Sequence, residues 1–159
     1  MTTDTPETDA QATVISWMAE YQDHNRRLAE ARPANKDALF DALARAGITR
    51  VDVEFDGYGD SGQIESITVR AGDAEAALPD DRIDFLNPVR GRPDQVERST
   101  HTVTEAIETM VYALLQETHG GWPNNDGAYG EFTFDVEKRT VTLDYNERYT
   151  DSDHSFHEF

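Results

Sequence analysis

Cysteine is absent from the 159 residues of this chain, so disulfides, thiolate zinc sites and a cysteine nucleophile are excluded. Long apolar runs are absent too, since none approaches the roughly 20 residues that a membrane-spanning helix needs. The amino-terminal segment is acidic and lacks the basic start and apolar run of a signal peptide. We therefore expect a soluble, cytoplasmic protein with no membrane association.

Positive charge is scarce. Only 14 basic residues accompany 32 carboxylates, which gives a formal net charge of −18 at pH 7. Direct binding to nucleic acid is disfavoured, because contacts to phosphates require clustered lysine and arginine. Three explanations of the acidity remain open: adaptation to a salty cytoplasm, a negative surface that binds a basic protein partner, and simple solubility.

Familiar catalytic motifs are also missing. The sequence contains no Gly-x-Ser-x-Gly elbow, no phosphate-binding loop and no His-Glu-x-x-His motif. Ser61 lies between Asp60 and Gly62, without a neighbouring basic residue that would activate it. The sequence therefore names no catalytic residue and favours a non-enzymatic protein.

Apolar residues at helical spacing predict three helices. The first covers about residues 10–31 and ends at Pro33, and the second runs from Asn35, as its N-cap, to residue 46. The third covers residues 103–118 and begins at a capping box formed by Thr102 and Glu105. Charged residues predict the solvent-facing side of the first helix: Glu20, Asp23, Arg26 and Arg27.

Four segments alternate with a period of two and predict two β-hairpins, in residues 48–69 and 131–146. A bulge near Glu65 would bring the apolar residues of the second strand into phase. Between the first hairpin and the last helix we expect a helical turn at 74–78, a short strand at 83–86 and a loop at 88–93. The predicted fold is α+β, an antiparallel sheet of about four strands with about three helices on one face. We expect a disordered acidic tail (1–9), a single domain (10–150) and an acidic C-terminal tail (151–159).

If both hairpins join one sheet, five carboxylates project from the face opposite the core: Asp52, Glu54, Glu131, Asp135 and Asp144. Like charges directly opposite each other across a sheet cost a few tenths to about 1 kcal/mol per pair. Water and salt, a cation or a basic partner must therefore screen this face. A solvated face, a surface that binds a basic protein and a metal-dependent active site are the three interpretations.

The loop at 120–130 combines glycines with aromatic and amide side chains, which suits recognition of a partner. Its candidate binding residues are Trp122, Asn125, Asp126 and Tyr129. The alternative is that the two aromatic residues close the end of the core while the amides and glycines shape turns.

Two groups of residues are weak candidates for a metal site. Asp56, Asp60 and Glu65 offer oxygen ligands for Ca²⁺ or another divalent cation, although their spacing does not match an EF-hand, and a hairpin turn also explains them. His154 and His157 have zinc-ligand spacing but lie in the acidic tail. We expect no cofactor from the sequence.

Four motifs carry a resemblance to a known family: DGYGDSGQIE at 56–65, HGGW at 119–122, NDGAYG at 125–130 and NER at 146–148. Over roughly residues 48–159 the chain resembles a family of small bacterial proteins classed as a domain of unknown function. The resemblance implies no activity and no catalytic residues. It implies an association with plasmids and phages, and so favours an inhibitor that presents carboxylates to a DNA-binding enzyme in place of phosphates.

Overall fold

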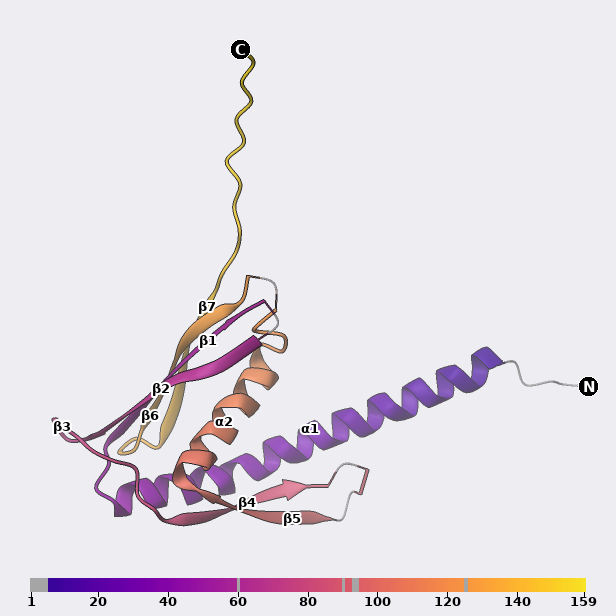
Figure 1. The fold of residues 1–159 in the computed structure, drawn as a ribbon. Helices are drawn as coiled ribbons and strands as arrows, with labels where there is room; N and C mark the ends of the chain where they lie inside the picture. The colour runs from indigo at the N-terminus through magenta and orange to yellow at the C-terminus, as the bar shows by residue number, and fades with distance from the viewer. Residues whose placement is uncertain (1–5, 60, 90, 93–94, 125) are drawn as a thin grey trace, which may run out of the picture.

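The computed structural model describes residues 6–59, 61–89, 91–92, 95–124 and 126–159, with side chains from Ser16 onward. The described residues form two helices, a five-stranded sheet and a two-stranded sheet, in which all strand pairs are antiparallel (Figure 1). The predicted α+β class is confirmed.

The five-stranded sheet has the order β3-β2-β1-β6-β7. Its strands are β1 (Arg50–Tyr58), β2 (Ser61–Ala71), β3 (Ala74–Glu75), β6 (Ala128–Asp135) and β7 (Thr140–Glu147). The two predicted hairpins are β1–β2 and β6–β7, and they join because β1 pairs with β6. The helical turn predicted at 74–78 is wrong. Gly72 has a φ of +65°, which lets the chain turn tightly so that β3 pairs with β2.

The predicted bulge is confirmed. In the β1–β2 ladder Glu54 is opposite Ser66 and Phe55 is opposite Ile64, so Glu65 is the extra residue. Because a bulge shifts the alternation of side chains by one, Ile64 and Ile67 both pack against the core.

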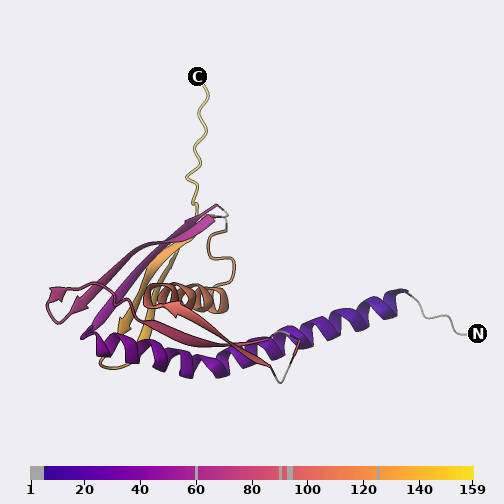
Figure 2. The ribbon, with the colours of Figure 1, turned by 60° about the horizontal axis from the view of Figure 1, so that its bottom comes forward.

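The first helix differs from its prediction. α1 (Pro6–Arg45) is one helix of 40 residues that continues through Pro33, and Figure 2 shows that it curves along its length. An interior proline typically costs about 3 kcal/mol, because its nitrogen cannot donate a hydrogen bond and its ring clashes with the preceding turn. Tertiary contacts on both sides of Pro33 outweigh this cost. On the C-terminal side, Leu39, Phe40 and Leu43 are fully buried.

Asn35 is not a helix N-cap. Its side chain bonds strand β4 (Arg82–Pro88), donating to the Leu86 carbonyl at 3.1 Å and accepting from the Leu86 N–H at 2.7 Å. β4 pairs with β5 (Val96–Thr102) to form the two-stranded sheet. The short strand predicted at 83–86 is therefore confirmed within β4, whereas β5 was not predicted.

The last helix agrees with its prediction. α2 (Val103–Thr118) begins at the capping box of Thr102 and Glu105 and ends at His119. α2 and the C-terminal part of α1 lie on one face of the five-stranded sheet (Figures 1 and 2). Buried residues of α2, the end of α1, β1 and β6 form the core. Within the described part of the chain, neither helix contains a stretch that is long and apolar enough to cross a membrane.

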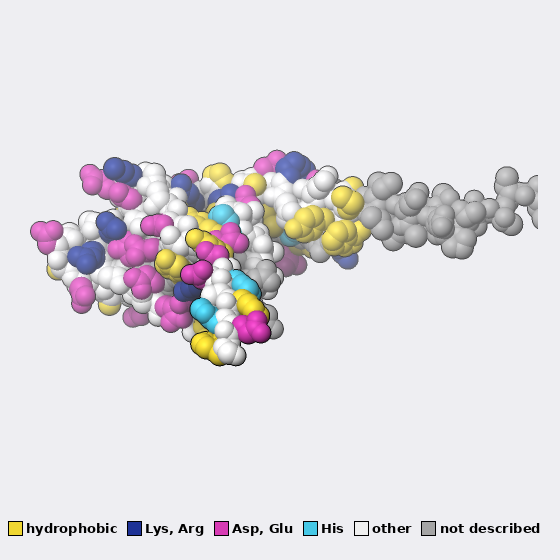
Figure 3. All heavy atoms as spheres, turned by 90° about the horizontal axis from the view of Figure 1, so that it is seen from above, with side chains coloured by type: hydrophobic (Ala, Val, Ile, Leu, Met, Phe, Trp, Pro, Cys, Tyr) yellow, Lys and Arg dark blue, Asp and Glu magenta, His cyan; other side chains and the backbone are white. Residues whose placement is uncertain are grey.

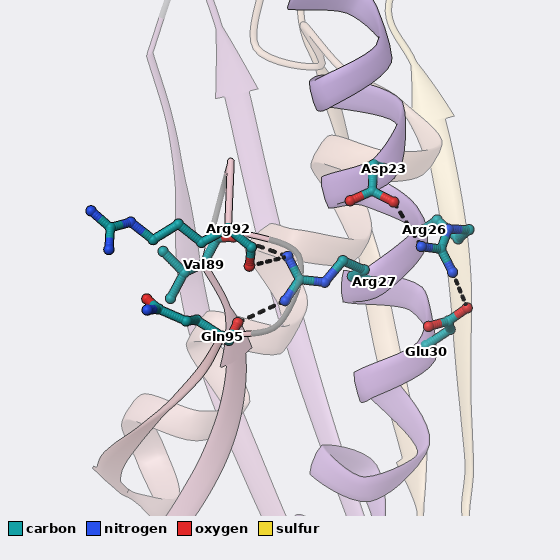
Figure 4. Close-up of polar contacts among 7 residues, drawn as sticks. All are labelled: Asp23, Arg26, Arg27, Glu30, Val89, Arg92 and Gln95. Carbon is teal, nitrogen blue, oxygen red and sulfur yellow. Dashed lines mark hydrogen bonds and ion pairs between the residues drawn. The ribbon is translucent and has the colours of Figure 1, made fainter.

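Arg27 connects α1 to the turn of the β4–β5 hairpin (Figure 4). Its guanidinium donates to the carbonyls of Val89 at 3.0 Å, Arg92 at 3.0 Å and Gln95 at 2.7 Å. Only 8% of Arg27 is exposed, so its predicted place on the solvent-facing side of the helix is wrong. Arg26, by contrast, is exposed and forms ion pairs with Asp23 and Glu30 on the same helix.

Candidate functional site

The five predicted carboxylates lie on the outer face of β1, β6 and β7, opposite the buried side chains of β1 and β6 and the half-buried side chains of β7. We call Asp52, Glu54, Glu131, Asp135 and Asp144 the acidic face. The register places three of them in one line across the sheet, since Glu131 is opposite both Glu54 and Asp144. We call these three residues the acidic row. Figure 3 shows acidic side chains gathered over the sheet, interrupted by a few basic ones.

Within the acidic face, Asp52 is the carboxylate that a basic side chain neutralises among the described residues. The Arg50 side chain donates to both carboxylate oxygens of Asp52, at 2.9 and 3.0 Å, and Thr133 donates at 3.1 Å. Glu54 accepts a hydrogen bond from Ser66 at 3.2 Å. Among the described residues, no ion pair involves any member of the acidic row. Arg82, Arg92 and Arg98 form no ion pair with the acidic face among the described residues. The fourth arginine of this segment, Arg90, lies outside the described residues.

The unfavourable electrostatic environment of the acidic face is clearest at Glu131, whose pKa is raised. Burial raises the pKa of Glu131 above its ordinary value, and the negative charge of Asp52 raises it further. A hydrogen bond to Asp52 and the charge of Glu54 act in the same direction, while Arg50 opposes them. The carboxylate form of Glu131 is therefore less favoured in the folded protein than in the unfolded chain, and a nearby positive charge would offset this effect.

We expect Glu131→Gln to stabilise the protein at pH 7 by a few tenths to about 1 kcal/mol, because it removes two like-charge contacts across the sheet. A carboxyl group with a raised folded-state pKa opposes folding when ionised, and this opposition disappears as the pH falls through that pKa. The gain should therefore shrink towards acidic pH. Urea denaturation of both proteins as a function of pH measures it.

Glu137→Gln in the exposed β6–β7 turn is the control for this prediction, since it removes one charge outside the acidic face. A gain of equal size in both variants would show that net charge, rather than the acidic row, is responsible.

Trp122 is buried, whereas the sequence predicted an exposed side chain. Only 8% of it is exposed, so the expectation of an exposed aromatic anchor is wrong at this residue. Its ring packs edge-on against Phe55 and covers Gly57 and Gly62. A Cβ on Gly57 would lie 2.6 Å from the ring, and one on Gly62 would lie 2.3 Å from it. The alternative prediction, that Trp122 closes the end of the core, is the one the structure supports.

The remaining loop residues lie beside this contact. Tyr129 is exposed, and its ring lies 4.6 Å from the guanidinium carbon of Arg148. Asp126 accepts a hydrogen bond from Thr150 at 2.6 Å. Asn125 lies outside the described residues.

Arg148 joins three of the four motifs. It donates to the Asp56 carboxylate at 2.8 Å and to the Gly57 carbonyl at 3.1 Å, and its own backbone N–H donates to the Gly127 carbonyl at 2.9 Å. Together with Trp122, this contact brings all four motifs to the same end of the five-stranded sheet. The motifs therefore hold the two loops at this end together beside the acidic face.

The predicted metal ligands are dispersed. Asp56 is engaged by Arg148, Asp60 lies outside the described residues, and Glu65 lies at the bulge, where Gln63 donates to it at 3.1 Å. His154 and His157 are exposed in a C-terminal segment without helix or strand. No group of three histidine or acidic side chains able to hold a metal ion occurs in the described part of the chain. The cation site remains a prediction.

The sequence did not predict two polar features around the β4–β5 hairpin. One is the contact of Arg27 with the hairpin turn. The other is a network in which the Ser99 hydroxyl lies 2.6 Å from the His101 ring and accepts a hydrogen bond from Asn87. Ser99 and His101 are two residues apart on a strand, so recognising β5 would have placed them on one face. No local signal identifies Arg27, whose partners are 62 to 68 residues away.

Comparison with known protein families assigns the chain to a family. The family model of DUF6878, a family of unknown function, matches residues 31–159. The chain belongs to this family. The predicted resemblance to a domain of unknown function is thereby confirmed, and the DUF6878 match covers both sheets and α2 while residues 6–30 of α1 precede it. No curated protein and no solved structure matches the chain.

Proposed function

We propose that this DUF6878 protein is a non-enzymatic binding protein whose acidic face engages a basic protein, with carboxylates taking the place of DNA phosphates. The observation that carries the proposal is the acidic row. Three carboxylates lie opposite one another on adjacent strands without an ion pair among the described residues, although this arrangement opposes folding.

The geometry suits a partner with several arginines or lysines. Neighbouring strands are about 4.8 Å apart, so the acidic row presents negative groups at a spacing that basic side chains can bridge. Asp52 shows that an arginine can neutralise a carboxylate of this face, since the Arg50 Nε–H donates to both of its oxygens. A positive partner would also relieve the unfavourable charge of Glu131. Complementary charge of this kind governs the rate and specificity of association, and salt weakens it.

The test removes the acidic row by the triple substitution Glu54→Gln, Glu131→Gln and Asp144→Asn. We expect the immobilised full chain to capture a DNA-binding protein from lysate of its source organism at low salt, and duplex DNA to compete for that protein. The triple variant should bind the captured protein about 3 kcal/mol more weakly, which is roughly a hundredfold in Kd. Titration of the purified partner measures the difference.

A matched control removes three exposed carboxylates elsewhere, by Asp81→Asn, Glu97→Gln and Glu137→Gln. Both triple variants have a net charge of −15, three units above the −18 of the natural chain. Equal losses in the two variants would contradict a localised binding face. Capture of no protein, or of one with which DNA does not compete, would also contradict the proposal and favour the salt-adapted interpretation.

A further inference from the structure

The first part of α1 extends away from the body of the protein (Figures 1 and 2). We call residues 6–32 the arm, whose C-terminal end contacts the β4–β5 hairpin turn through Arg27. Large apolar side chains of the arm are exposed to solvent: Trp17 (54%), Met18 (48%), Tyr21 (45%) and Leu28 (39%). Figure 3 shows hydrophobic side chains gathered on this part of α1, beside the grey atoms. A helix derives most of its stability from packing an apolar face, so these side chains indicate a surface that another molecule covers.

A groove of about 360 Å³ continues this apolar surface onto the body. Tyr21 and Leu28 belong both to the arm and to the lining of the groove. On the other side the groove is lined by Phe85 of β4 and by Met110 and Leu114 of α2. The arm and the groove therefore share Tyr21 and Leu28, so the exposed apolar side chains of the arm lead into the groove.

The charge of the arm differs from that of the whole chain. The arm carries five acidic and three arginine side chains, so its net charge is −2 within a chain of −18, and residues 16–32 hold three of these acidic side chains and all three arginines. These residues are Glu20, Asp23, Glu30, Arg26, Arg27 and Arg32. Two copies of a strongly acidic protein repel each other over most of their surfaces. Along the arm this repulsion is weak, so the arm is where a second copy of the chain can approach.

The spacing of the arm residues is symmetric. Met18, Tyr21, Asn25 and Leu28 follow one another at intervals of three, four and three residues, which is the repeat of a helix-pairing seam. The last three line the groove. Because the intervals read the same in both directions, antiparallel pairing places Met18 of one copy beside Leu28 of the other, and Tyr21 beside Asn25. It also places Trp17 of each copy level with Ala29 of the other, next to Leu28 of the groove.

We propose that the protein forms a twofold-symmetric dimer in which the two arms pair in antiparallel orientation and each covers the groove of the other copy. Such an interface is self-complementary, as twofold symmetry requires. It uses residues outside the acidic face, so the dimer presents two acidic faces. The dimer does not depend on the proposed function.

Sedimentation velocity of the full chain tests the dimer directly. We expect a dimer at micromolar concentration, strengthened by added salt, which screens repulsion between the acidic bodies. Trp17→Ser combined with Met18→Ser should raise the dimer Kd by roughly 30-fold or more, because it removes two large apolar contacts. Tyr149→Ser, at an exposed aromatic residue outside the arm, should leave the dimer intact. A chain that is monomeric at 100 µM would overturn the proposal.

Disulfide trapping tests the orientation, and the absence of natural cysteine makes it unambiguous. Two single variants are made, Met18→Cys and Leu28→Cys, and are oxidised separately and as an equimolar mixture. Antiparallel pairing predicts cross-linking chiefly between the two different variants in the mixture. Cross-linking chiefly within each variant alone would mean parallel arms and would overturn the arrangement. Circular dichroism of each reduced variant checks that α1 remains helical.

Discussion

Gly127→Ala is expected to abolish the native packing at the end of the sheet where the four motifs meet. Gly127 has a φ of +83°, and an added Cβ would lie 1.8 Å from the Gly57 carbonyl oxygen and 2.7 Å from the Tyr58 Cα. Both obstacles are backbone atoms of β1, so no side-chain rotation relieves the clash. We expect a loss of more than about 4 kcal/mol in the free energy of unfolding, a size seen only for severe steric or polar defects.

The matched control is Gly47→Ala. Gly47 also has a positive φ, +75°, but an added Cβ would meet no atom within 4 Å. Only the backbone strain of a left-handed alanine applies there, about 1–2 kcal/mol. Urea denaturation of both variants gives the comparison. If Gly127→Ala fails to fold while Gly47→Ala folds, the prediction holds, and equal stabilities would show that the two backbones do not approach closely.

Arg27→Ala is expected to detach the β4–β5 hairpin turn from α1. The substitution removes three charge-assisted hydrogen bonds and leaves the carbonyls of Val89, Arg92 and Gln95 without this donor. A hydrogen bond to a charged group contributes about 1.5–3 kcal/mol, and part of the loss is recovered when water reaches the carbonyls. We expect a net loss of about 3 kcal/mol, together with faster amide hydrogen exchange in β4 and β5.

The neighbouring arginine supplies the control for this prediction. Arg26 is exposed and forms only ion pairs within α1, and exposed pairs of this kind contribute little. Arg26→Ala should therefore change stability by less than about 0.5 kcal/mol. Arg27→Lys keeps the charge but loses the planar fork that reaches three acceptors, so it should fall between the two alanine variants. Similar losses in Arg26→Ala and Arg27→Ala would refute a special role for Arg27.

Local patterns in the sequence predicted the elements that are determined by residues close together in the chain. Alternation along β1 and β6 identified the strands and the side of each that is buried, and Thr102 with Glu105 identified the start of α2. The bulge followed from the mismatch between Ile64 and Ile67. In each case the residues that determine the structure lie within a few positions of one another.

Elements that depend on distant partners were missed. The continuation of α1 through Pro33 requires packing on both of its flanks, and Asn35 bonds a strand 51 residues away instead of capping a helix. β5 has few apolar residues, and its pairing with β4 defines it as a strand. The acidic face was predicted from alternation alone. The acidic row was not, because the register between β1 and β6 is a tertiary property that brings Glu54 opposite Glu131.

The two tryptophans of the chain lie in contrasting surroundings, so their fluorescence reports separately on the arm and on the body of the protein. Trp17 is half exposed on the arm, whereas Trp122 is enclosed by β1 and the motif loops. Emission at long wavelength therefore reports on whether the arm is covered, and emission at short wavelength reports on whether the body is intact. Quenching by iodide or acrylamide can follow assembly and unfolding separately in a single cuvette.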